Sequence, residues 1–185
     1  MSSVQHLTSA HPGFSYIQSR HTFRSLEKKA AQIMRRLQRS GFREKYCGPH
    51  AAAMALHFWT RKRNHIEQIY SSFDAAKVCK DGTTAAEMQA GLEKITGVFF
   101  SRIGQLQEER VESILSSGRP IMALMKVKED PEEYHWIAIV GSGNGLYSSL
   151  NFGKVELIPK GDFFGACTEI VYPESEEPRK KIKVS

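Results

Sequence analysis

The stretch that decides the fold of this chain reads Tyr46-Cys47-Gly48-Pro49-His50-Ala51-Ala52-Ala53-Met54-Ala55-Leu56. Proline is tolerated in the first turn of a helix, where its missing N–H matters least. A helix is therefore predicted to begin at about Gly48–Pro49 and to run towards Trp59. Cys47 then lies just before the helix, whose N-terminus stabilises negative charge and favours the thiolate. The stretch indicates a reactive cysteine presented by a helix.

A second stretch, from His135 to Gly141, begins with a histidine followed by the apolar run of a buried strand. An imidazole carried to Cys47 by that strand would act as the general base that activates the thiol. His50 is the alternative base, but it lies on the same helix as Cys47 and would point along that helix rather than across a cleft. We therefore expect His135 to be the base.

A base histidine needs a neighbour that accepts a hydrogen bond from its other ring nitrogen. Asn151 ends a predicted strand that the turn Gly141–Gly145 would return antiparallel to the His135 strand. Asp162 is the alternative, although its surroundings are more typical of a helix cap. The predicted catalytic residues are Cys47, His135 and Asn151.

Helical patterns fill the first half of the chain, and strand patterns fill the second. Apolar residues recur at helical spacing from Phe23 to Leu37, a helix capped near Thr84 ends at Gly97, and another spans about Glu108–Ser116. The predicted fold class is α+β, with N-terminal helices packed on a C-terminal antiparallel sheet. The expected strands are Ile121–Val127, His135–Val140, Leu146–Asn151, Val155–Ile158 and Thr168–Val171.

Composition divides the chain into three parts. Residues 1–19 are rich in serine, lack acidic residues and contain Pro12-Gly13, so they are predicted to be a flexible leader. Residues 20–173 form the expected single domain, and the charged, proline-bounded residues 174–185 form the expected flexible tail. An acid-poor, serine-rich start is compatible with a bacterial secretion leader, an organelle transit peptide or an ordinary disordered terminus.

The cysteines and the distribution of apolar residues indicate where in the cell the protein is expected. No run approaches the roughly 18 apolar residues of a membrane helix, and the start lacks the apolar block of a secretory signal. The three cysteines form no CxxC pair, which favours a reducing compartment. We expect a cytoplasmic protein, or one delivered into another cell without a classical signal peptide.

The net charge of +6 is concentrated at the N-terminus. Residues 1–45 contain nine Lys or Arg and two acidic residues, a net charge of +7, which leaves about −1 for the rest. No aromatic stacking pattern or base-reading motif accompanies this charge, so a solvated basic helix face is favoured over a nucleic-acid site. The charge would also attract an acidic protein substrate.

The sequence indicates no cofactor and no metal. Gly141, Gly143 and Gly145 are spaced too closely for a phosphate loop, and no lysine or helix follows them. No cluster of His, Cys, Asp and Glu has the spacing of metal ligands.

Several landmarks occur in order along the chain: Cys47–Met54, Asp81–Thr84 with Met88 and Leu92, Gly118–Ile121, His135–Gly141 and Asn151. Their order resembles that of papain-fold cysteine peptidases. The chain is most similar to the bacteriocin-leader (double-glycine) peptidases and their relatives, and more distantly to phytochelatin synthase. The resemblance spans about residues 40–166 and implies Cys47 as nucleophile, His135 as general base and acid, and Asn151 as the residue that orients it.

One position departs from the family pattern. These families usually carry a glutamine about six residues before the nucleophile, where it helps to form the oxyanion hole, but this chain has Gly41 there. Either Gln38 reaches the site, or another donor joins the Cys47 backbone N–H. Loss of one such donor typically lowers the rate by about 10²–10³.

The resulting hypothesis is a papain-like thiol hydrolase that cleaves a peptide bond in a protein or peptide substrate, with a secreted bacterial effector as one use compatible with the leader. Glutamine deamidation or acyl transfer by the same triad is an alternative enzyme function. A catalytically weak module that uses its cleft to bind a partner segment is the non-enzymatic alternative, supported by the missing glutamine.

Overall fold

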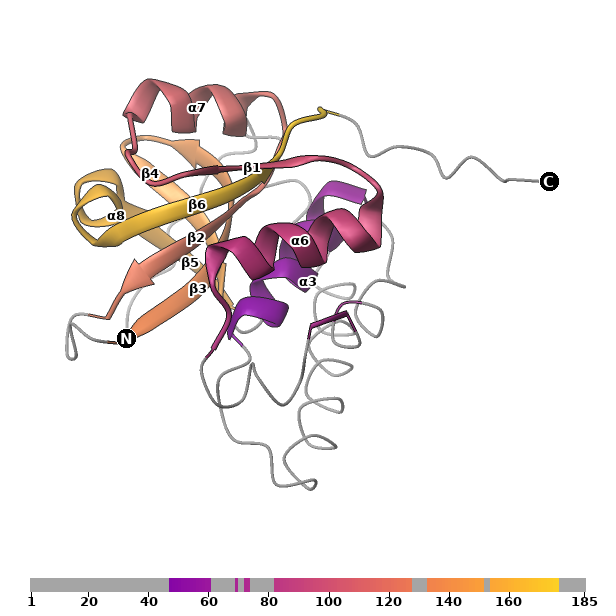
Figure 1. The fold of residues 1–185 in the computed structure, drawn as a ribbon. Helices are drawn as coiled ribbons and strands as arrows, with labels where there is room; N and C mark the ends of the chain where they lie inside the picture. Colours follow the sequence, from indigo (N-terminus) through magenta and orange to yellow (C-terminus); the bar gives the residue numbers. More distant parts are fainter. Residues whose placement is uncertain are drawn as a thin grey trace.

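The computed structural model describes residues 47–60, 69, 72–73, 82–127, 133–151 and 154–176. These residues form a six-stranded antiparallel sheet in the order β1-β6-β2-β3-β4-β5, with helices on both faces (Figure 1). The predicted α+β class is therefore confirmed. The leader at 1–19, the helix at 23–37 and the tail from residue 177 onward lie outside the described residues.

The first described helix, α3 (Cys47–Thr60), is buried on all sides from Gly48 to Trp59. A helix without a polar face belongs in a core. Its small alanine side chains let its backbone pack closely against the sheet, mainly on strand β3 (Tyr134–Gly143). The sequence placed the helix start one residue too late, because Cys47 is itself helical. Pro49 is compatible with this earlier start, since first-turn N–H groups have no partner within the helix.

Helix α6 (Ala85–Thr96) packs beside α3 and has the cap predicted for it. The Thr84 hydroxyl accepts a hydrogen bond from the Glu87 backbone N–H, and the Glu87 carboxylate accepts one from the Thr84 backbone N–H. This capping box satisfies two N–H groups that the helix leaves without partners. Gly97 ends the helix in the left-handed conformation at φ 67°.

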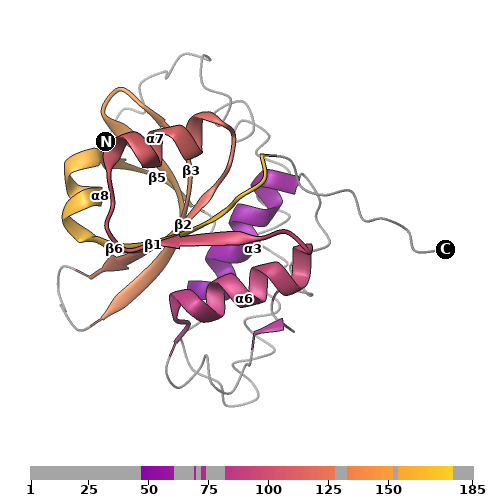
Figure 2. The same cartoon turned by 45° about the horizontal axis from the view of Figure 1, so that its top comes forward.

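The opposite face of the sheet is covered by α7 (Glu108–Ser116) and α8 (Lys160–Ala166), as Figure 2 shows. Both contribute to a second apolar cluster that includes Val111 of α7 and Phe163 of α8. Phe163 stacks edge to face on Tyr147 with ring centroids 4.8 Å apart. The predicted cap at Asp162 is wrong: the helix begins earlier, so Pro159 is the N-cap and Asp162 lies in the first turn.

Three of the five predicted strands, β3, β5 and β6, are longer than expected, β2 ends one residue earlier, β4 has the predicted bounds, and one strand was missed. β3 extends to Gly143, so the predicted turn Gly141–Gly145 shrinks to Asn144 and Gly145, whose φ angles are 53° and 75°. Two consecutive residues with positive φ make the tight hairpin turn that suits the twist of paired strands. β1 was missed because its four residues carry no alternating pattern. The six strands are β1 (Phe100–Ile103), β2 (Ile121–Lys126), β3 (Tyr134–Gly143), β4 (Leu146–Asn151), β5 (Lys154–Pro159) and β6 (Cys167–Pro173).

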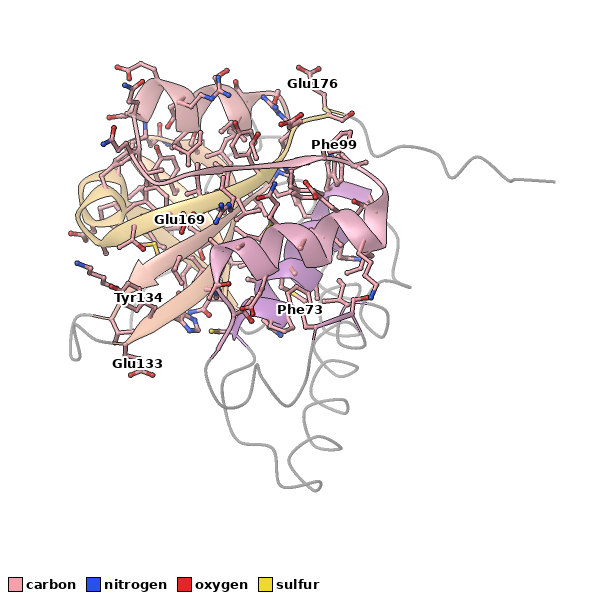
Figure 3. The ribbon with its side chains drawn as sticks, viewed as in Figure 1. Phe73, Phe99, Glu133, Tyr134, Glu169 and Glu176 are labelled. Atoms are coloured by element: carbon pink, nitrogen blue, oxygen red, sulfur yellow. The ribbon has the colours of Figure 1, made fainter. Side chains whose placement is uncertain are left out.

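The chain stays attached to the domain beyond β6. The Glu174 backbone N–H donates to the Phe99 carbonyl at 3.0 Å, and Trp59 Nε1 donates to the Glu176 carbonyl at 3.1 Å. Figure 3 shows Phe99 and Glu176 together at one end of the molecule, opposite the end where β3 begins. Glu174 and Glu176, which composition assigned to the tail, are therefore hydrogen-bonded to the domain.

Thr83, in the segment just before α6, contacts both the start of α3 and the start of β3. A Cβ atom at Gly48 would lie 2.5 Å from Thr83 Oγ1 and 2.6 Å from Thr83 Cβ, so only glycine fits there. The Thr83 carbonyl accepts a buried hydrogen bond from Trp136 Nε1 at 2.7 Å. Thr83 therefore fixes the first turn of α3 relative to the second and third residues of β3.

Gly48→Ala is predicted to destabilise the fold and to displace the first turn of α3. The clash with Thr83 should cost about 1–3 kcal/mol, which exceeds the roughly 1 kcal/mol that alanine gains over glycine in helix propensity. Thermal unfolding measures the change. Gly165→Ala in α8 is the matched control, since nothing lies within 4 Å of its added Cβ. Equal melting temperatures for Gly48→Ala and wild type would contradict this account.

Candidate active site

Cys47 occupies the first position of the buried helix α3 and is partly exposed to solvent. Its sulfur is hydrogen-bonded to the side chain of His135 and to the backbone N–H groups of Trp136 and Gly48. The N–H groups of the first turn have no acceptor within the helix, so they are available to a thiolate or to an oxyanion next to it. The nucleophile predicted from the sequence therefore lies in a setting that stabilises negative charge.

His135 is the second residue of β3, which packs along α3. Its Nε2 lies 2.9 Å from Asn151 Oδ1, which leaves Nδ1 as the nitrogen that faces Cys47. Asn151 ends β4, and the antiparallel pairing of Ala138 with Leu150 brings it back towards the start of β3. The structure thus brings together the three residues that the sequence singled out.

The contacts shift the pKa values of the thiol and the imidazole in opposite directions. Burial alone would raise the pKa of Cys47, but hydrogen bonds from His135 and from the Trp136 N–H outweigh it, and the net effect is a lowered pKa. The pKa of His135 is raised, chiefly by its hydrogen bond to Cys47, against the opposing effect of burial. A lowered thiol pKa beside a raised imidazole pKa favours a thiolate–imidazolium pair.

His50, the alternative base, has a different environment. Its side chain is buried, and burial together with the charge of His135 lowers its pKa to about 4. An imidazole with that pKa is neutral near pH 7 and cannot serve as the cation that stabilises the Cys47 thiolate. The expectation that His135 rather than His50 pairs with Cys47 agrees with this geometry.

Asp162, the alternative to Asn151, lies on α8, on the sheet face opposite α3. The residue hydrogen-bonded to His135 is Asn151, whose Oδ1 accepts from Nε2. Asn151 also donates from Nδ2 to Glu156 Oε2 on β5 at 3.2 Å. Sequence reasoning missed Glu156, because the contact depends on the register of β4 and β5, in which Ser149 faces Glu156.

The remaining sequence-based expectations concern the oxyanion-hole donor, metal ligands and membrane-spanning helices. Gln38 and Gly41, which bear on the oxyanion hole, lie outside the described residues. Across the described part of the chain, no group of three or more His, Cys, Asp and Glu could hold a metal ion. No helix in that part has the length and apolarity to cross a membrane.

No family model and no curated protein matches the chain, whereas solved structures do. A double-glycine-motif protease from an AMS/PCAT transporter, solved with the leader peptide, has a TM-score of 0.51 and 13% identity, covering 72% of this chain and 87% of that one. The peptidase domain of Streptococcus ComA, a bifunctional ABC transporter in quorum sensing, has a TM-score of 0.51 and 19% identity, covering 73% and 93%. The chain therefore has the papain-like fold of double-glycine peptidase domains, as the resemblance implied.

The pKa shifts predict that Cys47 alkylates quickly at pH values where an ordinary thiol does not. Because its pKa is lowered, the thiolate persists as the pH falls below the usual range of thiols and is lost only below the shifted value. In His135→Ala, burial is no longer opposed by the imidazole, so the pKa should rise and the rate near pH 6 should fall about tenfold for each unit of that rise. Iodoacetamide labelling against pH, followed by mass spectrometry, measures this.

Cys167 is the internal control, since burial raises its pKa to about 12. It should label slowly in both proteins. A Cys47 rate that follows the pH dependence of a free thiol, or that is unchanged in His135→Ala, would contradict the assignment of an activated pair.

Proposed function

We propose that this protein is a cysteine peptidase in which Cys47 is the nucleophile, His135 the general acid and base, and Asn151 the residue that orients His135. The observation that carries the proposal is the hydrogen-bonded series from the Cys47 sulfur through both ring nitrogens of His135 to Asn151. An activated thiol, a base and an orienting group within contact are the parts that acyl transfer through a thioester requires.

The reaction follows from the position of each group. The Cys47 thiolate attacks the carbonyl carbon of the scissile amide, and the developing oxyanion is stabilised by the Cys47 backbone N–H at the start of α3. The His135 imidazolium gives its proton to the departing amine, which leaves Cys47 acylated as a thioester. His135 then removes a proton from water, which attacks the thioester and releases the carboxylic acid and the free thiol.

A polypeptide is the substrate class that we propose. The similarity to a double-glycine-motif protease solved with a leader peptide supports this choice. Cleavage within a protein, rather than of a free peptide, and delivery into another cell as an effector are predictions that rest on the charge and composition of the N-terminal segment alone.

The proposal is tested by incubating a proteome-derived peptide library with wild type and with Cys47→Ala, and by comparing the new N-termini. A peptidase should create N-termini in the wild-type sample only. Glutamine deamidation would instead raise peptide masses by about one dalton without new termini. If both proteins bind peptides from the library, but neither protein creates new N-termini or raises a peptide mass, the enzymatic proposal is contradicted and a binding module is favoured.

Substitutions of the three residues should have graded effects on kcat/KM for the best cleaved peptide. Cys47→Ala and His135→Ala should each reduce it by about 10³-fold or more, since each removes a group that forms or breaks bonds. Asn151→Ala should cost less, about 10- to 100-fold, because Asn151 orients rather than reacts. Asp162→Ala, on the other face of the sheet, serves as the control and should leave kcat/KM unchanged. Equal losses in Asn151→Ala and Asp162→Ala would overturn the assignment of Asn151.

A further inference from the structure

The hydrogen bonds of the site continue past Asn151 to an acidic residue on the edge strand β5. Asn151 ends β4, and β5 returns beside it with Asn151 paired to Lys154 and Ser149 paired to Glu156. This register brings Glu156 Oε2 to 3.2 Å from Asn151 Nδ2, while Asn151 Oδ1 lies 2.9 Å from His135 Nε2. The two ends of one amide therefore contact a carboxylate and an imidazole.

We propose that Glu156 is a positioning residue that fixes the orientation of the Asn151 amide and thereby selects which nitrogen of His135 carries the proton in its neutral state. The inference deepens the proposed function and rests on it. Glu156 does not touch the thiol or the substrate carbonyl in this mechanism, and it acts only through Asn151.

The argument depends on which groups can donate. An ionised carboxylate only accepts hydrogen bonds, whereas an amide donates from nitrogen and accepts at oxygen. Glu156 therefore holds the nitrogen of Asn151 towards itself and turns the oxygen towards His135. If the amide were reversed, two oxygens would face each other at Glu156, and each would lack a donor.

The orientation of the amide decides whether His135 can act as a base. An oxygen at Nε2 favours the neutral tautomer with its proton on Nε2, which leaves the Nδ1 lone pair free to take the proton of Cys47. A reversed amide would donate to Nε2 and favour the proton on Nδ1, so the nitrogen that faces the sulfur could no longer accept. The same oxygen at Nε2 also accepts from the imidazolium once it forms.

The charge of Glu156 has a smaller effect on His135 than the hydrogen bonds of His135 itself. The groups whose charge or polarity bears on His135 are Cys47 and His50 on α3, Asn151 on β4 and Glu156 on β5, and its partner on β2 is the uncharged Met125. Glu156 raises the pKa of His135, but less than the hydrogen bonds that His135 makes to Cys47 and Asn151 do. Because Glu156 is exposed, water and salt screen its charge, whereas the direction of the hydrogen bond remains.

The effect of Glu156→Gln on the Cys47 alkylation rate, measured in two backgrounds, distinguishes the hydrogen bond of Glu156 from its charge. In the wild-type background, Glu156→Gln introduces a donor that tolerates both amide orientations, so Cys47 alkylation near pH 6 should fall about two- to fivefold, the scale of an exposed polar pair. In the Asn151→Asp background the same Glu156→Gln change should raise the rate, because an amide that donates replaces one of two facing carboxylates. A purely electrostatic role would lower the rate in both backgrounds.

Glu133→Gln is the matched control, since Glu133 is exposed, lies two residues before His135 and just before β3 begins, and undergoes the same chemical change (Figure 3). It should not alter the alkylation rate by more than a small factor in either background. A rate change of the same sign and size from Glu133→Gln and Glu156→Gln would overturn the proposal.

Nitrogen-15 NMR of the His135 ring gives a readout that does not depend on reactivity. Glu156→Gln should increase the fraction of neutral His135 with its proton on Nδ1, and Glu133→Gln should not. An unchanged tautomer fraction in Glu156→Gln would overturn the role of Glu156 even if Cys47 is activated. Slow alkylation of Cys47 in wild type, together with the predicted tautomer shift in Glu156→Gln, would contradict the proposed function and leave the positioning role of Glu156 intact.

Discussion

The site depends on the contact between the first turn of α3 and the start of β3, which Thr83 holds in place. Thr83 lies against Gly48 so closely that a side chain on Gly48 would overlap it, and its carbonyl accepts the buried hydrogen bond from Trp136. Cys47 precedes Gly48 and His135 precedes Trp136, so Thr83 fixes the neighbours of both Cys47 and His135. The sulfur and the imidazole meet because the backbone on either side of each is held.

Burial and hydrogen bonding have opposite effects on the ionisation of the Cys47 thiol and the His135 imidazole. Burial of Cys47 disfavours the thiolate, and burial of His135 disfavours the imidazolium, so burial opposes the charged form of each group. Their mutual hydrogen bond, the N–H groups of Trp136 and Gly48, and the Asn151 oxygen reverse the balance for the pair. Ionisation is therefore a property of the assembled site, and it requires the helix and the sheet to be packed together.

The elements whose signals are local could be predicted from the sequence. Thr84 and Glu87 form a capping box, Gly97 ends the same helix, and Pro49 marks the first turn of α3, so these two helices were predicted close to their observed bounds. That Cys47, His135 and Asn151 would lie together could be predicted from helix polarity and from the hairpin that returns Asn151 to His135. Even so, the hairpin turn was predicted too wide, because three of its residues continue β3 instead.

Contacts between distant residues could not be predicted in this way. Thr83 and Trp136 are 53 positions apart, and nothing in either segment indicates that a tryptophan donates to that carbonyl. Glu156 is likewise an ordinary acidic residue until the register of β4 and β5 places it beside Asn151. β1 is a strand chiefly because β6 pairs with it, and pairing of this kind is a tertiary effect that outweighs local preference.

The central claim is that Cys47 and His135 form a thiolate–imidazolium pair, and the most direct measurement is the ultraviolet absorbance of the thiolate as the pH is varied. The difference between wild type and Cys47→Ala isolates the signal of this one sulfur. The account predicts that the absorbance is already present well below the ordinary thiol pKa of about 8.5 and that it is lost there in His135→Ala. A thiolate signal that appears only around or above that value in both proteins would contradict it.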